Sequence, residues 1–290
     1  MNIAILSKGE TLYSTQSLLK AGTARNHVME VMNPSHCKLM IENGRPQVLF
    51  HDELVDDLHA IIPRIGASNT YYGSSLVRHF SAMGVFTVVS EYGILQSRDK
   101  WTCLQLLINA NIPVPNTVLG ASSNNEFLLS NFNEYPTIIK ILESTHGNGV
   151  ILAESYVNAL STIEALKTAG VKFLLQEYIA ESKGSDIRII VVDGKVVAAM
   201  KRECREGDFR SNLHRGGTSE NITLSYDEEN IALRAAKALR LGVCGVDLLQ
   251  SNKGPLVLEV NSTPGLEGIE KTTGTNISGS IISYIERNKR

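Results

Sequence analysis

Long apolar runs and paired cysteines are both missing from this sequence of 290 residues. No run approaches the roughly 20 apolar residues that a membrane-spanning helix needs. The first residues, MNIAILSKGE, lack the basic region, long apolar region and cleavage site of a secretory signal, which predicts a cytoplasmic protein. Cys37, Cys103, Cys204 and Cys244 are scattered along the chain, which argues against a zinc site or a disulfide framework.

An excess of charge of one sign is also missing. The formal net charge is -2, so nothing predicts bulk attraction to nucleic acid or to a membrane. Hydrophobic residues make up 43% and charged residues 20%, as in a globular protein, and the length allows two domains.

Two common nucleotide-binding motifs are absent. Gly9 follows the first apolar run without the Gly-x-Gly-x-x-Gly spacing of a dinucleotide site, so we assign no nicotinamide binding. The glycine-bearing turn THGNGV is not a P-loop, because it lacks Gly-Lys-Ser/Thr and precedes a strand-like segment.

The first 90 residues alternate between strand and helix patterns. Apolar runs at 2–7, 27–34, 60–66 and 84–90 predict strands, and 11–27 and 74–83 predict helices, while the segment through residue 52 is polar and turn-rich. Such alternation predicts a small parallel α/β domain. Arg64, in IPRIG at a predicted strand end, is a candidate for binding a substrate carboxylate, and a surface arginine beside a turn is an equal alternative.

A strand-rich region follows. Residues 91–100 are interpreted as the passage between domains, and 99–112 as a helix. PTIIKILES and ILAES flank THGNGV as a predicted hairpin whose amides could face phosphates, with Lys140 on the first strand. Glycine-rich hairpin turns are also common in proteins that bind nothing. The segment 171–180 is a predicted buried strand that ends in Gln176, Glu177 and Tyr178.

Two strands joined by Asp193-Gly194 come next, with Asp186 and Arg188 on one face of the first strand. The loop GDFRSNLHRGG then carries Arg210 and Arg215, which predict a phosphate or carboxylate binder. A solvated loop is the alternative explanation of this composition. Residues 227–242 are expected to form a helix.

A second hairpin, 243–249 and 255–260 around SNKG, carries Asp247, Glu259 and Asn261. Glu259 and Asn261 are two residues apart on a strand and share a face. Asp247 and Asn261 could serve only as turn formers, but Glu259 within an apolar strand would be costly unless it is paired or metal-bound. Oxygen ligands without cysteine predict Mg²⁺ or Mn²⁺.

Together, these motifs resemble the ATP-grasp superfamily and most closely the RimK family of glutamate ligases. The resemblance spans nearly the whole chain and rests on VDLL, LEVNSTPGLEGIEKTTG, GDFRSNLHRGG, ESTHGNGVILAES, LLQEYIA and IPRIG. It implies an N-terminal pre-ATP-grasp α/β domain over residues 1–97. A two-lobed ATP-grasp domain of antiparallel sheets and helices would then follow over 98–290, with a small lobe to about residue 179 and a metal and catalytic lobe from 180.

The resemblance also implies roles for individual residues. Those assigned to ATP are Lys100, Lys140, Ser144, Gly147 and Gly149 at the phosphates, Glu177 and Tyr178 at adenine, and Asp186 at the ribose. Those assigned to the phosphate and acyl-transfer region are Arg210, Ser211 and Asn212, with Arg188 and Arg210 as catalytic residues. Those assigned to two Mg²⁺ or Mn²⁺ ions are Asp247, Glu259 and Asn261, and candidates for the substrate are Arg64, His214 and Arg215.

The implied activity is ATP-dependent α-L-glutamate ligation through an acylphosphate. Glutamate would be added to the C-terminus of a small-subunit ribosomal protein, and poly-α-glutamate could be made. The resemblance also suggests a homo-oligomer, with a tetramer as one form. Two alternatives stay open: a carboxylate-amine ligase for a small-molecule acceptor, and a nucleotide-sensing protein without turnover.

Overall fold

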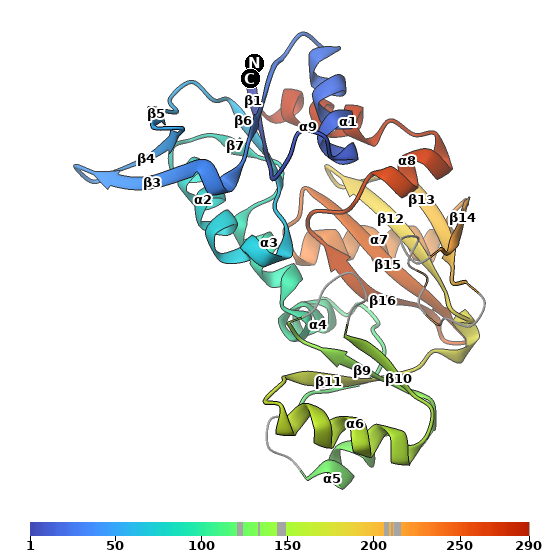
Figure 1. The fold of residues 1–290 in the computed structure, drawn as a ribbon. Coiled ribbons are helices and arrows are strands. Elements are labelled where there is room, and N and C mark those ends of the chain that lie inside the picture. The colour runs from blue at the N-terminus through green and yellow to red at the C-terminus, as the bar shows by residue number, and fades with distance from the viewer. Residues whose placement is uncertain are drawn as a thin grey trace.

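The computed structural model describes residues 1–120, 124–132, 134–143, 149–205, 209, 211 and 216–289. Within these ranges a parallel α/β part is followed by two antiparallel sheets with their helices (Figure 1). The fold class expected from the sequence, parallel first and antiparallel later, is confirmed. None of the helices in the described ranges has the length and apolar character needed to cross a bilayer.

The N-terminal sheet is parallel, in the order β2-β1-β6-β7. Its strands alternate with helices, as the apolar pattern predicts, and β1 lies in the middle between β2 and β6. The strands are β1 (Asn2–Ser7), β2 (Val28–Met32), β6 (Ala60–Arg64) and β7 (Phe86–Thr87). The helices and 3₁₀ turns are α1 (Tyr13–Thr23), η1 (Pro34–His36), η2 (Ala67–Asn69), α2 (Thr70–Ala82) and α3 (Glu91–Arg98).

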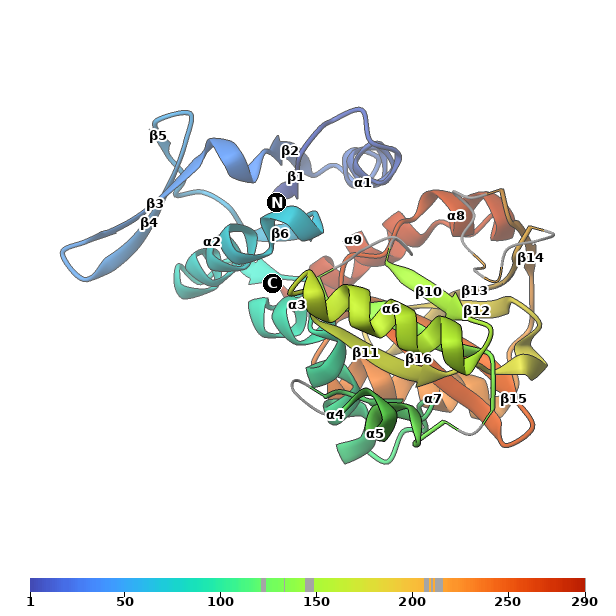
Figure 2. The same cartoon turned by 60° about the horizontal axis from the view of Figure 1, so that its bottom comes forward.

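The turn-rich segment between β2 and β6 forms a separate antiparallel sheet. It consists of β3 (Cys37–Glu42), β4 (Arg45–Phe50) and β5 (Glu53–Leu54). Asn43 and Gly44 have φ of 51° and 74°, the left-handed values of a two-residue hairpin turn. This sheet projects from the body of the molecule in both views (Figures 1 and 2).

The predicted passage between domains is partly helical, because residues 91–98 form α3. Ser90 caps this helix by accepting from the Gly93 amide at 3.1 Å. Asp99 ends it and caps α4 (Lys100–Asn109), accepting from the amides of Trp101 and Thr102. The two helices therefore meet at Asp99 without a flexible linker between them.

The smaller antiparallel sheet has the order β10-β9-β11-β8. Helices α5 and α6 lie on one face of it (Figure 1), and their buried side chains form a hydrophobic cluster with those of the sheet. The strands are β8 (Thr117–Val118), β9 (Thr137–Ile141), β10 (Val150–Ala153) and β11 (Phe173–Glu177). The helices are α5 (Asn125–Leu129) and α6 (Tyr156–Thr168).

The larger antiparallel sheet has the order β14-β13-β12-β15-β16, and both hairpins predicted for it are present. Helix α7 packs against this sheet and begins at a capping box formed by Ser225 and Glu228. The strands are β12 (Ser185–Val192), β13 (Lys195–Glu203), β14 (Thr218–Asn221), β15 (Val243–Ser251) and β16 (Gly254–Asn261). The helices and 3₁₀ turn are η3 (Ala180–Ser182), α7 (Tyr226–Ala238), α8 (Glu267–Thr273) and α9 (Ile277–Asn288).

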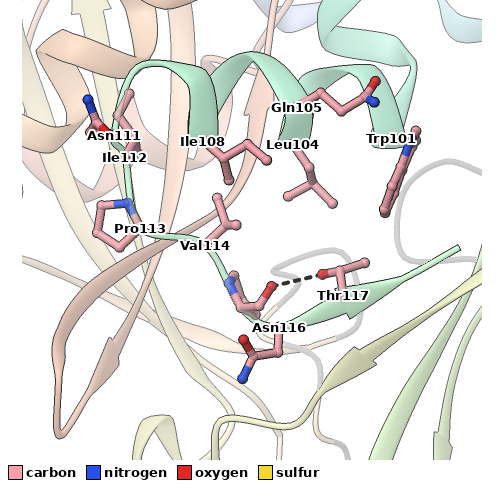
Figure 3. A pocket seen from close by; sticks show the side chains of 11 residues that line it. Trp101, Leu104, Gln105, Ile108, Asn111, Ile112, Pro113, Val114, Asn116 and Thr117 are labelled. Carbon is pink, nitrogen blue, oxygen red and sulfur yellow. Dashed lines mark hydrogen bonds between the residues drawn. The ribbon is translucent and has the colours of Figure 1, made fainter. Parts of the chain in front are cut away.

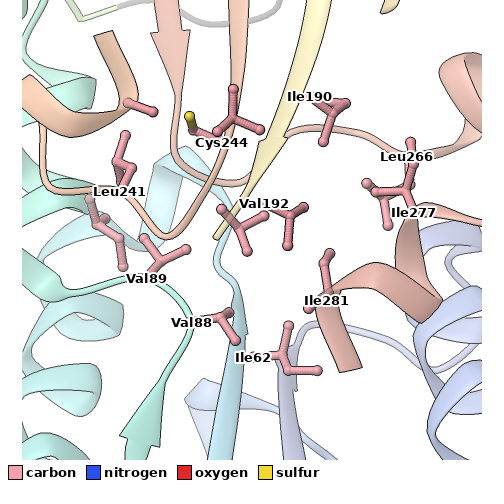
Figure 4. Packing of buried hydrophobic residues seen from close by; sticks show 14 of the residues in the cluster. Ile62, Val88, Val89, Ile190, Val192, Leu241, Cys244, Leu266, Ile277 and Ile281 are labelled. Atoms are coloured by element: carbon pink, nitrogen blue, oxygen red, sulfur yellow. The ribbon is translucent and has the colours of Figure 1, made fainter. Parts of the chain in front are cut away.

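One hydrophobic core joins the N-terminal sheet to the larger antiparallel sheet. Ile62 of β6 and Ile281 of α9 belong to the same buried cluster as Val192 of β12 and Cys244 of β15 (Figure 4). The smaller sheet has its own cluster, which includes Ile139 and Ile163. The smaller sheet is thus a separate packing unit, whereas the other two sheets share one.

Candidate functional site

Asp247 and Glu259 lie directly opposite each other on β15 and β16. A bulge in this pair produces that arrangement, because the register shifts by one residue between Asp247 and Leu248. The Asn261 side chain donates to Oε1 of Glu259 at 3.0 Å. The three residues that we predict to bind metal therefore lie together. In the described part of the chain, no group of three or more His, Cys, Asp or Glu side chains is placed to hold a metal ion.

The two carboxylates differ in exposure. The Asp247 side chain is 2% exposed, whereas that of Glu259 is 51% exposed. The expectation that Glu259 sits within a buried strand is therefore wrong, because its neighbours Val257 and Val260 are buried while its own side chain faces outward. Crowding by protein and the charge of Asp247 raise the pKa of Glu259.

Arg188 and Arg202 both bind Asp247. Arg188 donates from Nε to Oδ1 at 2.8 Å and from Nη2 to Oδ2 at 2.6 Å, and Arg202 adds a bond to Oδ2 at 3.0 Å. Burial alone would raise the pKa of Asp247, but the two guanidinium charges outweigh it and hold the pKa well below its usual range. Asp247 is therefore a charged carboxylate that the protein itself holds in place.

Asp186, which we predict to bind ribose, lies in the same buried network. Its two carboxylate oxygens accept from Nε and Nη2 of Arg202 at 2.7 and 2.5 Å. The side chain of Ser211 also hydrogen-bonds Asp186. Asp186 is 4% exposed, so this carboxylate is engaged mainly by protein. Arg202 had no role in our sequence interpretation.

Lys100 of α4 and Lys140 of β9 both lie close enough to Glu259 to interact with its charge. Lys100 donates to the carbonyl oxygen of Leu142 at 2.9 Å, and both lysines interact electrostatically with Glu259. Loss of solvent lowers the pKa of Lys140 to about 8, with Lys100 adding to the effect and Glu259 opposing it. The two predicted phosphate-binding lysines therefore lie within electrostatic range of Glu259, one of the predicted metal ligands.

Glu177 and Tyr178 end β11, where the chain leaves the smaller sheet, and both are half-buried. Glu177 accepts a hydrogen bond from the Asn116 side chain at 2.5 Å. Gly149 adopts φ of 73°, and its carbonyl oxygen accepts from the Ile141 amide. Predicted site residues that lie outside the described ranges are Ser144, Gly147, Arg210, Asn212, His214 and Arg215.

Arg64 contacts the segment that follows the metal-binding strand. Its Nη2 donates to the carbonyl oxygen of Pro264 at 2.7 Å, and burial lowers its pKa to about 10. Arg98 donates to Thr263 Oγ1 at 3.4 Å in the same segment and to the carbonyl oxygen of Ile65, which follows β6. These two arginines connect the end of β16 to the N-terminal sheet.

A surface pocket of about 610 Å³ lies elsewhere. In Figure 3, Trp101, Leu104 and Ile108 of α4 face the segment 113–117 across this pocket. None of the predicted site residues lines it. It approaches the predicted adenine region only through Asn116, the hydrogen-bond partner of Glu177.

Comparison with known families agrees with this architecture. The RimK PreATP-grasp domain matches residues 1–94, and the RimK-like ATP-grasp domain matches residues 97–285. A probable alpha-L-glutamate ligase of Maridesulfovibrio salexigens is 50% identical over 99% of this chain and 96% of its own length. A protein of the same name from Picosynechococcus is 49% identical over the same shares.

Solved structures show the same fold at low identity. The ATP-grasp ligase PsnB with its minimal precursor superposes with a TM-score of 0.78 at 18% identity, over 99% of this chain and 98% of PsnB. A RimK domain protein from Sphaerobacter thermophilus gives 0.73 at 21% identity, over 99% of this chain and 100% of that one. D-alanine–D-alanine ligase from Bacillus anthracis gives 0.66 at 17% identity, over 100% and 97%.

The fold and the matched domains define an ATP-grasp enzyme, an ATP-dependent carboxylate-amine ligase. Within this class, the two RimK domain matches and the relatives of about 50% identity identify the family. The chain belongs to the RimK family.

Proposed function

We propose that this protein is an α-L-glutamate ligase that extends the C-terminus of a small-subunit ribosomal protein and can make poly-α-glutamate. The observation that carries the ligase chemistry is the cluster in which Asp247 lies opposite Glu259, and Glu259 interacts electrostatically with Lys100 and Lys140. The names of the relatives support glutamate as the amine, and the resemblance of GDFRSNLHRGG and PGLEGIEKTTG supports the ribosomal acceptor.

The donor set fits a divalent cation and a triphosphate. Two carboxylates and an amide oxygen are hard ligands suited to Mg²⁺ or Mn²⁺. Bound metal would neutralise charge during phosphoryl transfer. We propose that Asp247, Glu259 and Asn261 hold two such ions.

The lysines and the end of β11 supply the remaining contacts to ATP. Lys100 and Lys140 would bind phosphate oxygens, with the segment from Ser144 through Gly147 to Gly149 above them, and Glu177 and Tyr178 would frame adenine. For Asp186 the contacts favour a different role from ribose binding, because Arg202 already engages both of its oxygens. We propose that Asp186 holds Arg202, which in turn holds Asp247.

The reaction has two steps. A carboxylate oxygen of the acceptor attacks the γ-phosphorus, and the bond to the β-γ bridging oxygen breaks to release ADP. The glutamate amine then attacks the acylphosphate carbon, loses a proton and expels phosphate, leaving an amide. Arg188 and the Arg210 loop would stabilise the developing negative charge, and Arg64, His214 and Arg215 would contact substrates.

A mass-resolved acceptor screen tests this proposal. The protein is incubated with ATP, Mg²⁺, glutamate and either the ribosomal protein, peptides with its C-terminus, or free amino acids, and ADP and product masses are recorded. We expect ADP release with mass increments of one glutamyl residue on the ribosomal protein. Turnover confined to a small metabolite would favour the alternative acceptor, and ATP binding without turnover on any acceptor would favour a nucleotide sensor.

A further inference from the structure

The arm, residues 37–54, carries an open sheet edge. Its sheet has the order β3-β4-β5, so β3 has a partner strand on one side only. The arm extends from the N-terminal sheet, away from both antiparallel sheets of the ATP-grasp region (Figures 1 and 2). A six-residue edge strand of this kind is a template for pairing with another strand.

The hairpin register determines which backbone groups face outward. The two-residue turn at Asn43 and Gly44 makes Glu42 and Arg45 a hydrogen-bonded pair, so alternate residues of β3 point their backbone groups to β4. Leu39 and Ile41 therefore direct their amides and carbonyls to the open edge. No described residue forms a strand pair with this edge.

Helix α2 leaves that edge free between residues 38 and 42. The Tyr72 hydroxyl donates to the Cys37 carbonyl oxygen at 2.6 Å and so covers only the start of the strand. A ring nitrogen of His79 lies 3.0 Å from the Met40 carbonyl oxygen, which points to β4 and not to the edge. Ile41 is 76% exposed, so a large apolar side chain of β3 lies open to solvent.

The sequence of β3 is complementary to itself. If two copies of the strand run antiparallel about Met40, Lys38 of each lies opposite Glu42 of the other, and Ile41 lies opposite Leu39. The outward backbone groups of Leu39 and Ile41 would then form the hydrogen-bonded pairs of the new ladder. Other registers also place outward-facing residues opposite each other, such as Leu39 with Leu39, but this one alone also pairs Lys38 with Glu42.

We propose that two copies of this chain associate through antiparallel pairing of β3 with β3 about a twofold axis at Met40. The partner is a second copy because Lys38 and Glu42 lie two residues to either side of Met40, so the same strand running in the opposite direction places a positive charge opposite each negative one. The pairing also covers the exposed Ile41 side chain with Leu39 of the other copy. The pairing lies on the arm, away from the sheet that carries Asp247 and Glu259.

Charge reversal tests the pairing. Glu42→Lys places like charges opposite each other twice and is expected to raise the dimer dissociation constant about tenfold or more. The double variant Lys38→Glu with Glu42→Lys restores the opposite charges and should restore dimerisation. Glu53→Lys, the same reversal on the far edge of the arm, should change nothing. Sedimentation equilibrium measures the constants, and circular dichroism verifies folding.

A cross-link tests the register independently of electrostatics. In the proposed pairing the Met40 Cβ atoms are about 4.5–5.5 Å apart, close enough that Met40→Cys should form an intermolecular disulfide on mild oxidation. Glu53→Cys and the unaltered chain should not cross-link under the same conditions. An unaltered chain that stays monomeric up to its solubility, or a dimer that tolerates Glu42→Lys and gives no Met40→Cys cross-link, would overturn the proposal.

Discussion

Glu259 has half of its side-chain surface open to solvent and lies opposite Asp247, so it is the more accessible of the two carboxylates that we propose to bind a cation. Asp247 opposite it is already fixed by Arg188 and Arg202, so adding a cation would chiefly change the environment of Glu259. The neutral amide of glutamine keeps the size of the side chain and removes its charge. Replacing Glu259 by glutamine therefore tests metal binding with little effect on folding.

Glu259→Gln should lower ATP turnover roughly a hundredfold or more, because a lost charged ligand weakens stabilisation of the phosphates. The midpoint of thermal unfolding should shift little, since the replaced side chain is half-exposed. ADP release and a melting curve measure the two effects. Glu220→Gln on β14 serves as a control, and turnover like that control would remove Glu259 from the metal site.

Asp186 and Arg202 are expected to stabilise the fold as a pair. Removing either partner leaves the other charge buried and unpaired. Asp186→Asn and Arg202→Met should therefore each reduce the free energy of unfolding by about 3–5 kcal/mol. The double variant should lose less than the sum. Urea unfolding measures the cycle. A ribose role would instead appear as a raised KM for ATP with unchanged stability in Asp186→Asn.

Arg64→Ala should affect acceptor use more than ATP binding. The hydrogen bond from Arg64 to the Pro264 carbonyl lies between the N-terminal sheet and the segment that follows Asn261, away from the predicted adenine contacts. We expect a severalfold rise in KM for the acceptor with the Kd for ATP unchanged. Steady-state kinetics and nucleotide titration measure the two constants, and unaltered acceptor kinetics would exclude Arg64 from the site.

At the scale of elements, two β-bulges decide which side chains meet. Counting from the turn at Asp193 and Gly194 would place Lys201 opposite Asp186, but a shift between Ile190 and Val191 places Arg202 there. A similar shift in the second hairpin places Glu259 opposite Asp247. The sequence predicts both hairpins from their turn residues, yet a bulge adds one residue through local packing and leaves no clear pattern.

The local sequence pattern also explains why the β3-β4 hairpin and α3 were not predicted. The β3-β4 hairpin has the Asn43-Gly44 turn signal, but the polar residues around it obscured the short strands in the sequence interpretation. In α3 only Gly93 and Ile94 are buried, so its sequence has little helical periodicity. The alternation of the N-terminal part was predictable because buried strands such as β1 are continuous apolar runs.

The contact between α9 and the N-terminus depends on pH. Glu286 accepts hydrogen bonds from Arg25 and His27, and the bond from Arg25 is the largest cause that lowers its pKa to about 2. Because the folded pKa lies below the unfolded value, the stabilisation is complete above about pH 4.5 and is lost as the pH falls towards 2.

Glu286→Gln should therefore reduce stability at pH 6 by about 1 kcal/mol or less, since the pair is partly exposed. The difference from the unaltered chain should shrink between pH 4.5 and 2. Denaturant unfolding across this range measures it, and Glu229→Gln on the exposed side of α7 provides the control. A difference that does not change with pH would contradict the assignment.

At the scale of the whole molecule, the boundary that we propose at residue 97 does not coincide with a break in packing. The N-terminal sheet and the larger antiparallel sheet share one hydrophobic cluster, whereas the smaller sheet has another. A domain motion would therefore move the smaller sheet relative to a body made of the other two sheets. Hinge motion of this kind needs no disruption of either core.

Hydrogen exchange can test this division with a matched pair of substitutions. Ile281 and Ile163 are both fully buried, the first on α9 in the shared cluster and the second on α6 in the cluster of the smaller sheet. Replacing either by alanine should cost about 2–5 kcal/mol locally. We expect Ile281→Ala to speed exchange in both β1 and β12 while β9 and β11 stay protected, and Ile163→Ala to do the reverse. Exchange that accelerates equally in all three sheets would mean that the molecule unfolds as a single unit, and the smaller sheet could then not move as an independent body.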